Sequence, residues 1–570
     1  SCFQHIVDTT GKVSPISTCP LDADFAADFA RRCAIVARIV RPKMMLLEDD
    51  YQLSNHPGFR LGCFCPAHLK RFAGYAGREY SRAELNELFS AFPMKAQELR
   101  RQWAKMSHDT MLDFSRTLRE GINAVSPETR IWLCEPCTTD LDGGLSKDIP
   151  EVLAGEGNKP AIRIFGTQYG SKDVGREIPA DLSHTMYSAE HLPDNFELFH
   201  ESDTYPHNRF FSSAALMESI MTGAMMIGCD SSLMIGGQYL DDPLEEFGYF
   251  AMYKNCVKRW RALQEALRGG ELAGCQIPYR HEFEALFARP SWEPGGAIYG
   301  LRAWAQFMGR FGFPYSTREK KVKLLTRAFA DAMDDRELTA VLAGAALLDS
   351  GAAAAVQERG LSRLMGVRVT TGDPIPAVEE LILPAAGVPE IRGKLLYNFA
   401  YAPSGSEAAE YAKLELDGAE ALTSYRGPEQ KVLQPGLTRF VNERGGRVAV
   451  MGCSVSNNSS NLYNYRKKAI LARLLEWLNG EPLDAVIQNA PNAWMLFNKN
   501  EERAIMMVTN LSPDEIECPV IALAPKWRHC SVTELDEYGE WKPCEARVEE
   551  GTLRLPGPAQ YMKPRIFRLA

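Results

Sequence analysis

Two apolar segments of this chain each end abruptly in acidic residues, and this pattern constrains the fold more than any other feature of the sequence. Pro42–Asp50 turns acidic at Glu48, and Asn195–Arg209 turns polar and charged at Glu201. Buried strands that run directly into ionisable groups are typical of α/β barrels, in which the functional groups lie at the carboxyl ends of parallel strands. We therefore expect both segments to be strands of one parallel sheet.

Apolar strand-like segments alternate with helical patterns over the first 270 residues. The expected strands are Lys43–Leu47, Ile131–Leu133, Ala161–Phe165, Phe196–His200 and Met225–Gly228. This alternation predicts a (β/α)8 barrel over residues 1–270, in which Glu48 ends the fourth strand and Glu201 the seventh. Only one βα unit fits before Lys43, so the chain is expected to start inside the barrel, near strand 3. The alternative is an open or differently wound sheet.

The remaining 300 residues predict two further domains, as expected for a chain too long for a single core. Residues 271–485 mix short helices and strands and predict a smaller α/β domain. After residue 485 the helical pattern disappears, and residues 486–570 predict a C-terminal β-sandwich. The expected strands there are Trp494–Asn498, Arg503–Thr509, His529–Glu534, Thr552–Leu555 and Arg565–Leu569.

The charge and hydropathy patterns exclude several classes of partner. The net charge is −9 and no basic block is present, so we expect no nucleic-acid partner. The longest apolar runs, such as Leu342–Leu348, are far shorter than a membrane span. The first residues lack the pattern of a signal peptide, and the 14 scattered cysteines are expected to be reduced, which together favour a cytoplasmic location.

The paired acidic strand ends favour glycoside hydrolysis. Strand alternation places Glu48 and Asp50 on one face, so that either can face Glu201 across the barrel mouth. One carboxyl group would protonate the leaving oxygen while the other, ionised, attacks the sugar. Residues expected to bind the substrate near them are His200, Asp203, His207, Arg209, Glu135, Tyr169 and Tyr187. The alternative is that these acids are solvated loop residues or helix caps.

A second cluster has the spacing of metal ligands. Cys63-Phe-Cys65-Pro-Ala-His68, joined by Cys19, offers three thiolates and an imidazole, a ligand set of structural zinc sites. The alternative is a group of buried, reduced thiols. Catalysis itself is expected to need no cofactor.

Several of these segments resemble the family 42 β-galactosidases, which are retaining barrel glycosidases. The segment from Cys19 through Cys63 and Cys65 resembles the zinc-bearing segment of that family, with His68 where the family has a cysteine. Leu342–Ala352 and Val441–Val450 resemble its glutamine-amidotransferase-like trimerisation domain.

The resemblance implies a retaining exo-β-glycosidase that acts on carbohydrate and forms homotrimers. It assigns the nucleophile to Glu201 and the acid/base to Glu48. Asp50 is the rival for acid/base, because Asp49-Asp50-Tyr51 is similar to the Asn-Glu-Tyr of the family. Three alternatives stay open: a β-mannosidase or other β-glycosidase of the same architecture, a sugar-binding barrel without catalysis, and a metal-dependent hydrolase using His56, His200 and His207.

Overall fold

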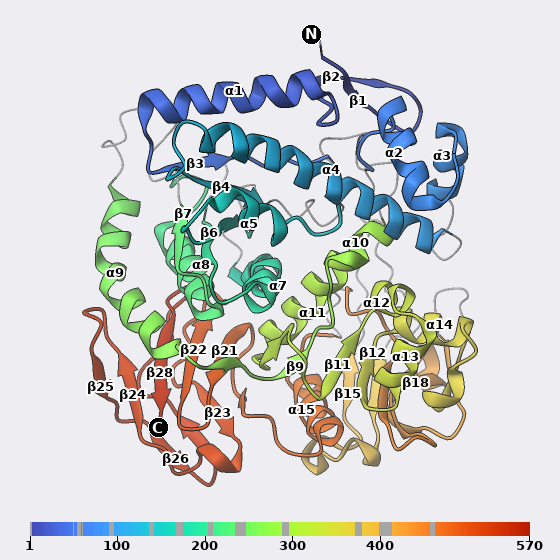
Figure 1. Cartoon of the computed structure of the whole chain (residues 1–570). Coiled ribbons are helices and arrows are strands. Elements are labelled where there is room, and N and C mark those ends of the chain that lie inside the picture. The colour runs from blue at the N-terminus through green and yellow to red at the C-terminus, as the bar shows by residue number, and fades with distance from the viewer. Residues whose placement is uncertain are drawn as a thin grey trace.

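In the computed structural model, a parallel sheet with its helices comes first along the chain. A mixed sheet and then two larger antiparallel sheets follow (Figure 1). It describes residues 3–49, 51–53, 59, 61–90, 96–135, 142–166, 175–202, 209–233, 247–287, 296–370, 379–397, 413–456 and 462–570. In Figure 1 the N-terminal helices lie at the top, the mixed sheet at the lower right and the C-terminal sheets at the lower left.

The first sheet is parallel and has its strands in sequence order. They are β3 (Met44–Leu47), β4 (Arg130–Glu135), β5 (Ala161–Ile164), β6 (Glu197–Glu201) and β7 (Ser231–Leu233). Four of the five expected strands are therefore present, and their order is that of consecutive barrel strands. Within the described residues no strand joins β7 back to β3, so the α/β class is confirmed and the closed barrel stays a prediction.

Two expectations for this region are wrong. Met225–Gly228, expected as a strand, contains the end of helix α8 (Ala214–Ile227), and the last strand follows at β7. The N-terminal residues form an antiparallel hairpin of β1 (His5–Val7) and β2 (Val13–Thr18) that pairs with no other sheet. The parallel sheet accordingly begins at β3.

Helices follow the strands of the parallel sheet along the chain. They include α1 (Ala23–Val40), α2 (Pro66–Ala76), α3 (Arg82–Ser90), α4 (Gln97–Asn123), α5 (Asp148–Ala154), α6 (Ile178–Asp181), α7 (Ser183–His191), α8 and α9 (Gly248–Leu267). Buried strand residues such as Leu133 and Ile162 form one core with residues of α4 and α5. α1 lies along α4 because Gly121 has no side chain: a Cβ there would lie 3.1 Å from that of Ala30.

In the part of the chain that the structure describes, the second sheet has nine strands in the order β10-β9-β11-β12-β19-β18-β17-β14-β15. Its strands are β9 (Cys275–Gln276), β10 (Tyr315–Ser316), β11 (Val322–Leu325), β12 (Ala345–Leu348), β14 (Glu379–Ile382), β15 (Leu395–Tyr397), β17 (Glu420–Arg426), β18 (Val432–Val441) and β19 (Arg447–Met451). The first five in that order are parallel and the others antiparallel.

Within the described residues, six helices and a separate two-stranded sheet accompany the second sheet. The helices are α10 (Glu282–Phe287), α11 (Ala297–Phe311), α12 (Arg327–Ala332), α13 (Asp335–Leu342), α14 (Ser350–Glu358) and α15 (Tyr465–Asn479). The two-stranded sheet pairs β13 (Val367–Thr370) with β16 (Lys413–Leu416) in antiparallel orientation. Both α14 and α15 pack on the central strands β12 and β19.

The C-terminal part consists of two antiparallel sheets around a shared core. The larger contains β8 (Glu271–Leu272), β21 (Ala493–Lys499), β22 (Ala504–Asn510), β24 (Val532–Leu535), β25 (Trp541–Pro543) and β28 (Arg565–Leu569). The smaller contains β20 (Ala485–Ile487), β23 (Val520–Leu523), β26 (Arg547–Glu549) and β27 (Thr552–Arg554). All five strands expected after residue 485 are present; the domain limits themselves stay predictions.

One buried tryptophan joins these parts of the molecule. Trp494 of β21 is fully buried, and its indole N–H donates to the hydroxyl of Tyr315 in β10 over 3.2 Å. A Cβ added at Gly223 of α8 or at Gly309 of α11 would touch the same indole ring. α8, the mixed-sheet region with α11 and β10, and the C-terminal sheet with β21 therefore pack closely against one another around this indole ring. Among the described residues no helix is long and apolar enough to cross a membrane.

Candidate functional site

The carboxyl ends of β3 and β6 meet at one guanidinium group. Arg163 Nη2 lies 2.5 Å from Asp49 Oδ1, 3.3 Å from Glu201 Oε1 and 3.8 Å from Glu48 Oε2. Glu48 Oε2 and Glu201 Oε1 both lie near the same Arg163 nitrogen, so the distance between these two oxygens cannot exceed the sum of 3.8 Å and 3.3 Å. The structure thus brings these two predicted carboxylates into one site.

The register of the sheet explains this convergence. Arg163 of β5 pairs with Phe199 of β6, and Glu201 is two residues further along the same strand. Because strand side chains alternate, Arg163, Phe199 and Glu201 lie on one face. Trp132 lies on that face as well, with its ring centroid 4.2 Å from that of Phe199. The side chain of Glu201 is only 3% exposed, whereas that of Glu48 is 70% exposed.

The electrostatics of this site keep Arg163 charged. Burial opposes the charge of Arg163, but Glu201 and the acids of β3 outweigh it and raise the pKa of the guanidinium. Burial also raises the pKa of the neighbouring Cys134 thiol, and the carboxylates add to this effect. Cys134 is therefore a neutral thiol in this site.

Sequence reasoning missed Arg163, although a signal was present. Arg163 stands alone inside the apolar strand Ala161–Ile164, and charged residues are almost never buried there unless they are paired. Asp49 was expected to face away from Glu48, but β3 ends at Leu47 and the chain turns, with the Tyr51 N–H donating to the Glu48 carbonyl. Strand alternation therefore does not extend to Asp49, which contacts Arg163.

Two predicted substrate-binding residues lie on the opposite face of the sheet. Glu135 and His200 occupy the same lateral row as Ile164, whose side chain belongs to the helix-covered core. Glu135 accepts hydrogen bonds from Ser146 and Ser188. The expectation that Glu135 and His200 line the pocket with Glu201 is therefore wrong, because strand alternation turns them toward the helices.

The environment of His200 keeps its imidazole neutral. The side chain is fully buried, and burial lowers the pKa of His200 to about 3, while a backbone hydrogen bond to Gly166 opposes the shift. Its Nδ1 lies 2.7 Å from the hydroxyl oxygen of Ser202. This histidine is a packed core residue and carries no charge near Glu201.

The other predicted residues are placed as follows. Tyr187 is buried on α7, with its hydroxyl 2.8 Å from His281 Nδ1 and its ring edge-on to Tyr279. Arg209 is exposed and lies beside Gly248, at the start of α9. Outside the described residues lie Asp50, Asp203, His207, Tyr169 and His56.

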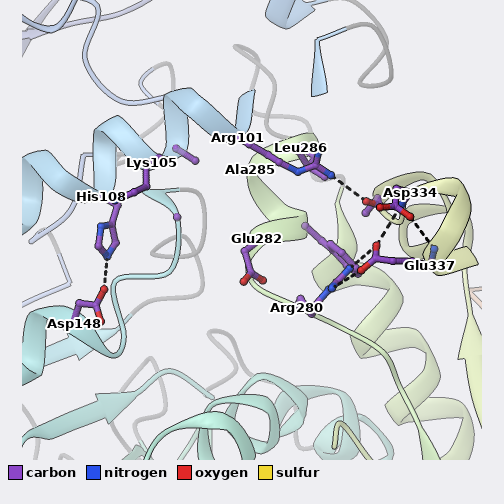
Figure 2. Close-up of a pocket in the computed structure, with 14 residues that line it drawn as sticks. Arg101, Lys105, His108, Asp148, Arg280, Glu282, Ala285, Leu286, Asp334 and Glu337 are labelled. Atoms are coloured by element: carbon purple, nitrogen blue, oxygen red, sulfur yellow. Dashed lines mark hydrogen bonds and ion pairs between the residues drawn. The ribbon is translucent and has the colours of Figure 1, made fainter. Parts of the chain in front are cut away.

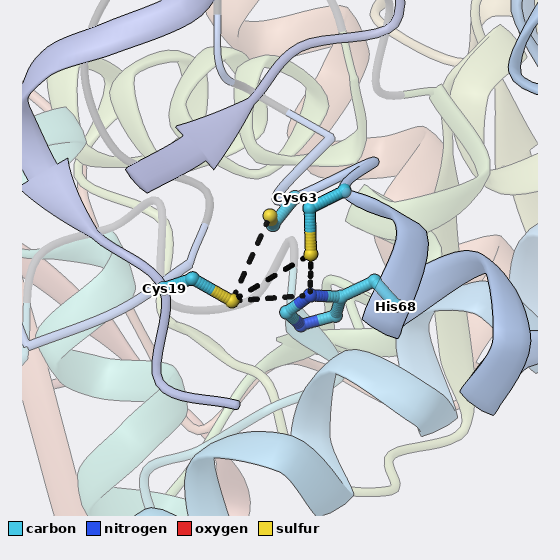
Figure 3. Close-up of side chains that lie close together, drawn as sticks. Cys19, Cys63 and His68 are labelled. Carbon is cyan, nitrogen blue, oxygen red and sulfur yellow. Dashed lines mark hydrogen bonds between the residues drawn. The ribbon is translucent and has the colours of Figure 1, made fainter. Parts of the chain in front are cut away.

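The predicted metal ligands form a compact buried cluster (Figure 3). The sulfur of Cys19 lies 3.8 Å from that of Cys65 and 4.0 Å from that of Cys63. His68 Nδ1 lies 3.4 Å from the Cys19 sulfur and 3.3 Å from the Cys65 sulfur. All four side chains are at most 1% exposed.

These distances fit one tetrahedral zinc ion. Two sulfurs bound to zinc at about 2.3 Å are roughly 3.8 Å apart, and a sulfur and an imidazole nitrogen are slightly closer. The separations are also too long for a disulfide, in which the sulfurs are about 2.05 Å apart. Cys65 caps α2, where the helix dipole favours a thiolate. The cluster would tie the β1–β2 hairpin to α2, away from Arg163.

Two cavities lie near α4, and one of them reaches the predicted acid/base Glu48. One of about 500 Å³ reaches Glu48 from the side of α1 and α4. Another, of about 630 Å³, lies between α4 and α10 (Figure 2). Its polar groups pair with one another: Arg280 forms two hydrogen bonds with Glu337, and His108 Nε2 lies 3.1 Å from Asp148. We assign no chemistry to that second cavity.

Comparison with solved structures identifies the fold. No protein-family model and no curated protein matches the sequence. α-L-Fucosidase isoenzyme 2 from Paenibacillus thiaminolyticus matches with a TM-score of 0.62 and 12% identity, over 97% of this chain and 81% of that one. The β-galactosidase from Bacillus circulans sp. alkalophilus matches with a TM-score of 0.61 and 12% identity, over 99% and 86%.

A member of the family named from the sequence is also among the matches. Gan42B, a GH42 β-galactosidase from G. stearothermophilus, has a TM-score of 0.57 and 10% identity over 99% of this chain and 85% of that one. The chain therefore has the fold of GH42 β-galactosidases and of an α-L-fucosidase. At these identities the likeness concerns the fold, and the chemistry must be argued from the site.

Proposed function

We propose that this protein is a glycoside hydrolase that cleaves terminal β-glycosides with retention of configuration. The observation that carries the proposal is the position of Arg163 between Glu201 and the acids that follow β3. Carboxylates at the ends of two strands of one parallel sheet meet the geometric need of glycoside hydrolysis. The glycosidase fold supports the same function.

The mechanism assigns different roles to the two glutamates. Glu201 is buried beside a cation, so it is the better candidate for the ionised nucleophile that attacks the anomeric carbon. Glu48 is exposed and lies farther from Arg163, so it is free to protonate the leaving oxygen and then to activate water. Asp49 lies 2.5 Å from Arg163, and this contact occupies its carboxylate. Asp50, outside the described residues, stays the rival of Glu48.

The tilted rings of Trp132 and Phe199 lie on the same face as Glu201. Aromatic faces of this kind suit the apolar side of a sugar ring. The matches include both β-galactosidases and an α-L-fucosidase, so the sugar that this protein prefers must be identified by experiment. The homotrimer stays a prediction based on the family resemblance.

We also propose one structural zinc ion held by Cys19, Cys63, Cys65 and His68. Zinc would fix the hairpin against α2 and take no part in the hydrolysis. Three thiolates and one imidazole leave no open coordination position, as in other structural zinc sites.

The function is tested with aryl β-galactosides, β-mannosides and α-L-fucosides. The Glu201→Gln variant should lose turnover of the preferred substrate while keeping its circular dichroism spectrum. Glu48→Gln should slow substrates with poor leaving groups far more than activated aryl glycosides, because only the former need proton donation. Proton NMR of the first-formed sugar should show the starting anomer. Unchanged turnover by Glu201→Gln would refute the assignment.

A further inference from the structure

A separate cavity of about 270 Å³ lies where α11, α15 and the loop before β21 meet. It is lined by Arg310, Phe311, Tyr463, Asn464, Tyr465, Lys468, Ala490, Pro491 and Asn492. This set contains two cationic side chains and three aromatic rings, and no carboxylate is found among these described lining residues. The cavity is therefore positively charged with an aromatic wall, and it is distinct from the Arg163 site.

Lys468 is the unusual group of this cavity, as its neighbour shows. Both Lys467 and Lys468 are buried near the start of α15. Lys467 Nζ lies 2.8 Å from each carboxylate oxygen of Glu380. Lys468 Nζ instead donates to the backbone carbonyl of Ala490 over 3.1 Å, and that carbonyl carries no charge. Burial alone lowers the pKa of Lys468 to about 7.

The surroundings of Lys468 strengthen the positive field. Arg310 Nε donates to Asn492 Oδ1 over 2.8 Å, and its guanidinium stacks 3.6 Å above the ring of Tyr463. α15 begins at Tyr465, so its positive N-terminal end also faces the cavity. A buried ammonium group without a counter-charge is costly, and an anion beside it removes that cost.

We propose that this cavity binds a small aromatic carboxylate, with the carboxylate on Lys468 and the ring against Phe311 and Tyr463. The volume is below that of a pocket for a drug-sized ligand, so the ligand is of about the size of benzoate. The aromatic walls select a flat ring, and the amine selects a negative charge. This site does not depend on the hydrolase proposed above.

The site has a predicted pH dependence. The other titratable or charged groups that face Lys468 are Arg310 from α11 and Tyr463 and Tyr465 from the start of α15; the loop 490–492 supplies none. Burial raises the pKa of Tyr463 to about 12, so this group stays neutral. Below pH 7 the amine is already charged when the ligand arrives. Above pH 7 binding must also bring a proton, so affinity should fall about tenfold per pH unit.

Isothermal titration of benzoate at pH 6 into the full chain tests the proposal. Lys468→Met should weaken binding tenfold to a hundredfold, the usual effect of losing a hydrogen bond to a charged group. Arg473→Met removes an exposed charge from the same helix and should bind like the wild type. Both variants should unfold cooperatively, and Lys468→Met should be at least as stable as the wild type at pH 6.

The comparison ligands separate the two parts of the proposal. Benzamide has the same ring without the charge, and inorganic phosphate has charge without a ring; both should bind at least tenfold more weakly than benzoate. Benzoate that fails to bind the wild type, or binds Lys468→Met equally well, would overturn the site. Equal binding of benzamide would overturn the role of the amine, and equal binding of phosphate the role of the ring.

Discussion

At the scale of single residues, Arg163 is surrounded by three acids whose mutual repulsion it relieves. Arg163→Met should lower kcat/KM by about 10²-fold or more, because the carboxylates lose the buried cation that orients them. Arg163→Lys should recover part of the loss. Arg130→Met, which breaks an ion pair with Glu197 at the other end of the sheet, is the matched control. Equal losses in Arg163→Met and Arg130→Met would show that Arg163 is merely structural.

His200 should make the protein sensitive to acid. Its pKa is lowered to about 3 in the folded state and is about 6.5 in the unfolded chain, so below pH 6.5 only the unfolded chain takes up the proton. Unfolding free energy should fall by up to about 1.4 kcal/mol per pH unit between pH 6.5 and 3. Urea titrations should show a shallower decline in His200→Gln than in the wild type or in His529→Asn, which alters an exposed histidine.

The sequence identified the acids of this site more readily than their partners. Glu48 and Glu201 could be predicted because each follows a local apolar strand. Arg163 lies on a third strand, and its contact with them depends on the register between strands, which no single segment encodes. Glu135 was assigned to the wrong face for the same reason, because its strand had to be aligned with β5 first. His200 is next to Glu201 on one strand, so alternation alone places the two side chains on opposite faces.

At the scale of elements, the cysteine cluster links β2 to α2. Cys63→Ser should release the zinc and lower the unfolding free energy by roughly 3 kcal/mol or more, since metal-binding energy is also folding energy. Elemental analysis should find about one zinc per wild-type chain. Cys518→Ala, at a cysteine outside the cluster, should leave both metal content and stability nearly unchanged. A wild-type chain without zinc would disprove the assignment.

A buried ion pair holds α15 against β14. Lys467 and Glu380 are 3% and 0% exposed, so Lys467→Met should cost about 3–5 kcal/mol by leaving a lone buried carboxylate. The double variant Lys467→Met with Glu380→Leu should regain most of that stability, because no buried charge remains. Chemical denaturation of the four proteins measures the coupling. Additive losses would contradict it.

The errors among the elements have physical causes. Met225–Gly228 was expected as a strand, but a short buried apolar run has the same pattern in a strand and in the last turn of a buried helix. All residues from Ser219 to Ile227 are buried in α8, so no polar face revealed the helical period. One βα unit was expected before Lys43, but its strand segment folds back on itself as the β1–β2 hairpin, next to Gly11, whose φ is positive.

At the scale of the whole molecule, the junction at Trp494 couples the parts of the chain. Its ring touches α8 and α11 and hydrogen-bonds Tyr315, so no part can unfold without exposing the surfaces of the others. Calorimetry should therefore show one main transition. Trp494→Ala should lower its midpoint, at a cost of about 3–5 kcal/mol, and split it into resolved steps. Separate transitions in the wild type would refute this coupling.

The placement of β8 has a practical consequence for anyone who wishes to divide the gene. Glu271–Leu272 pairs with β21 of the C-terminal sheet before the chain enters the mixed sheet. A cut near residue 485, where the last domain was expected to begin, would thus take an edge strand from a sheet whose neighbouring strand lies more than 200 residues later. Fragments that follow the apparent borders in sequence would lack part of their own framework, and shortened versions should be expressed together rather than apart.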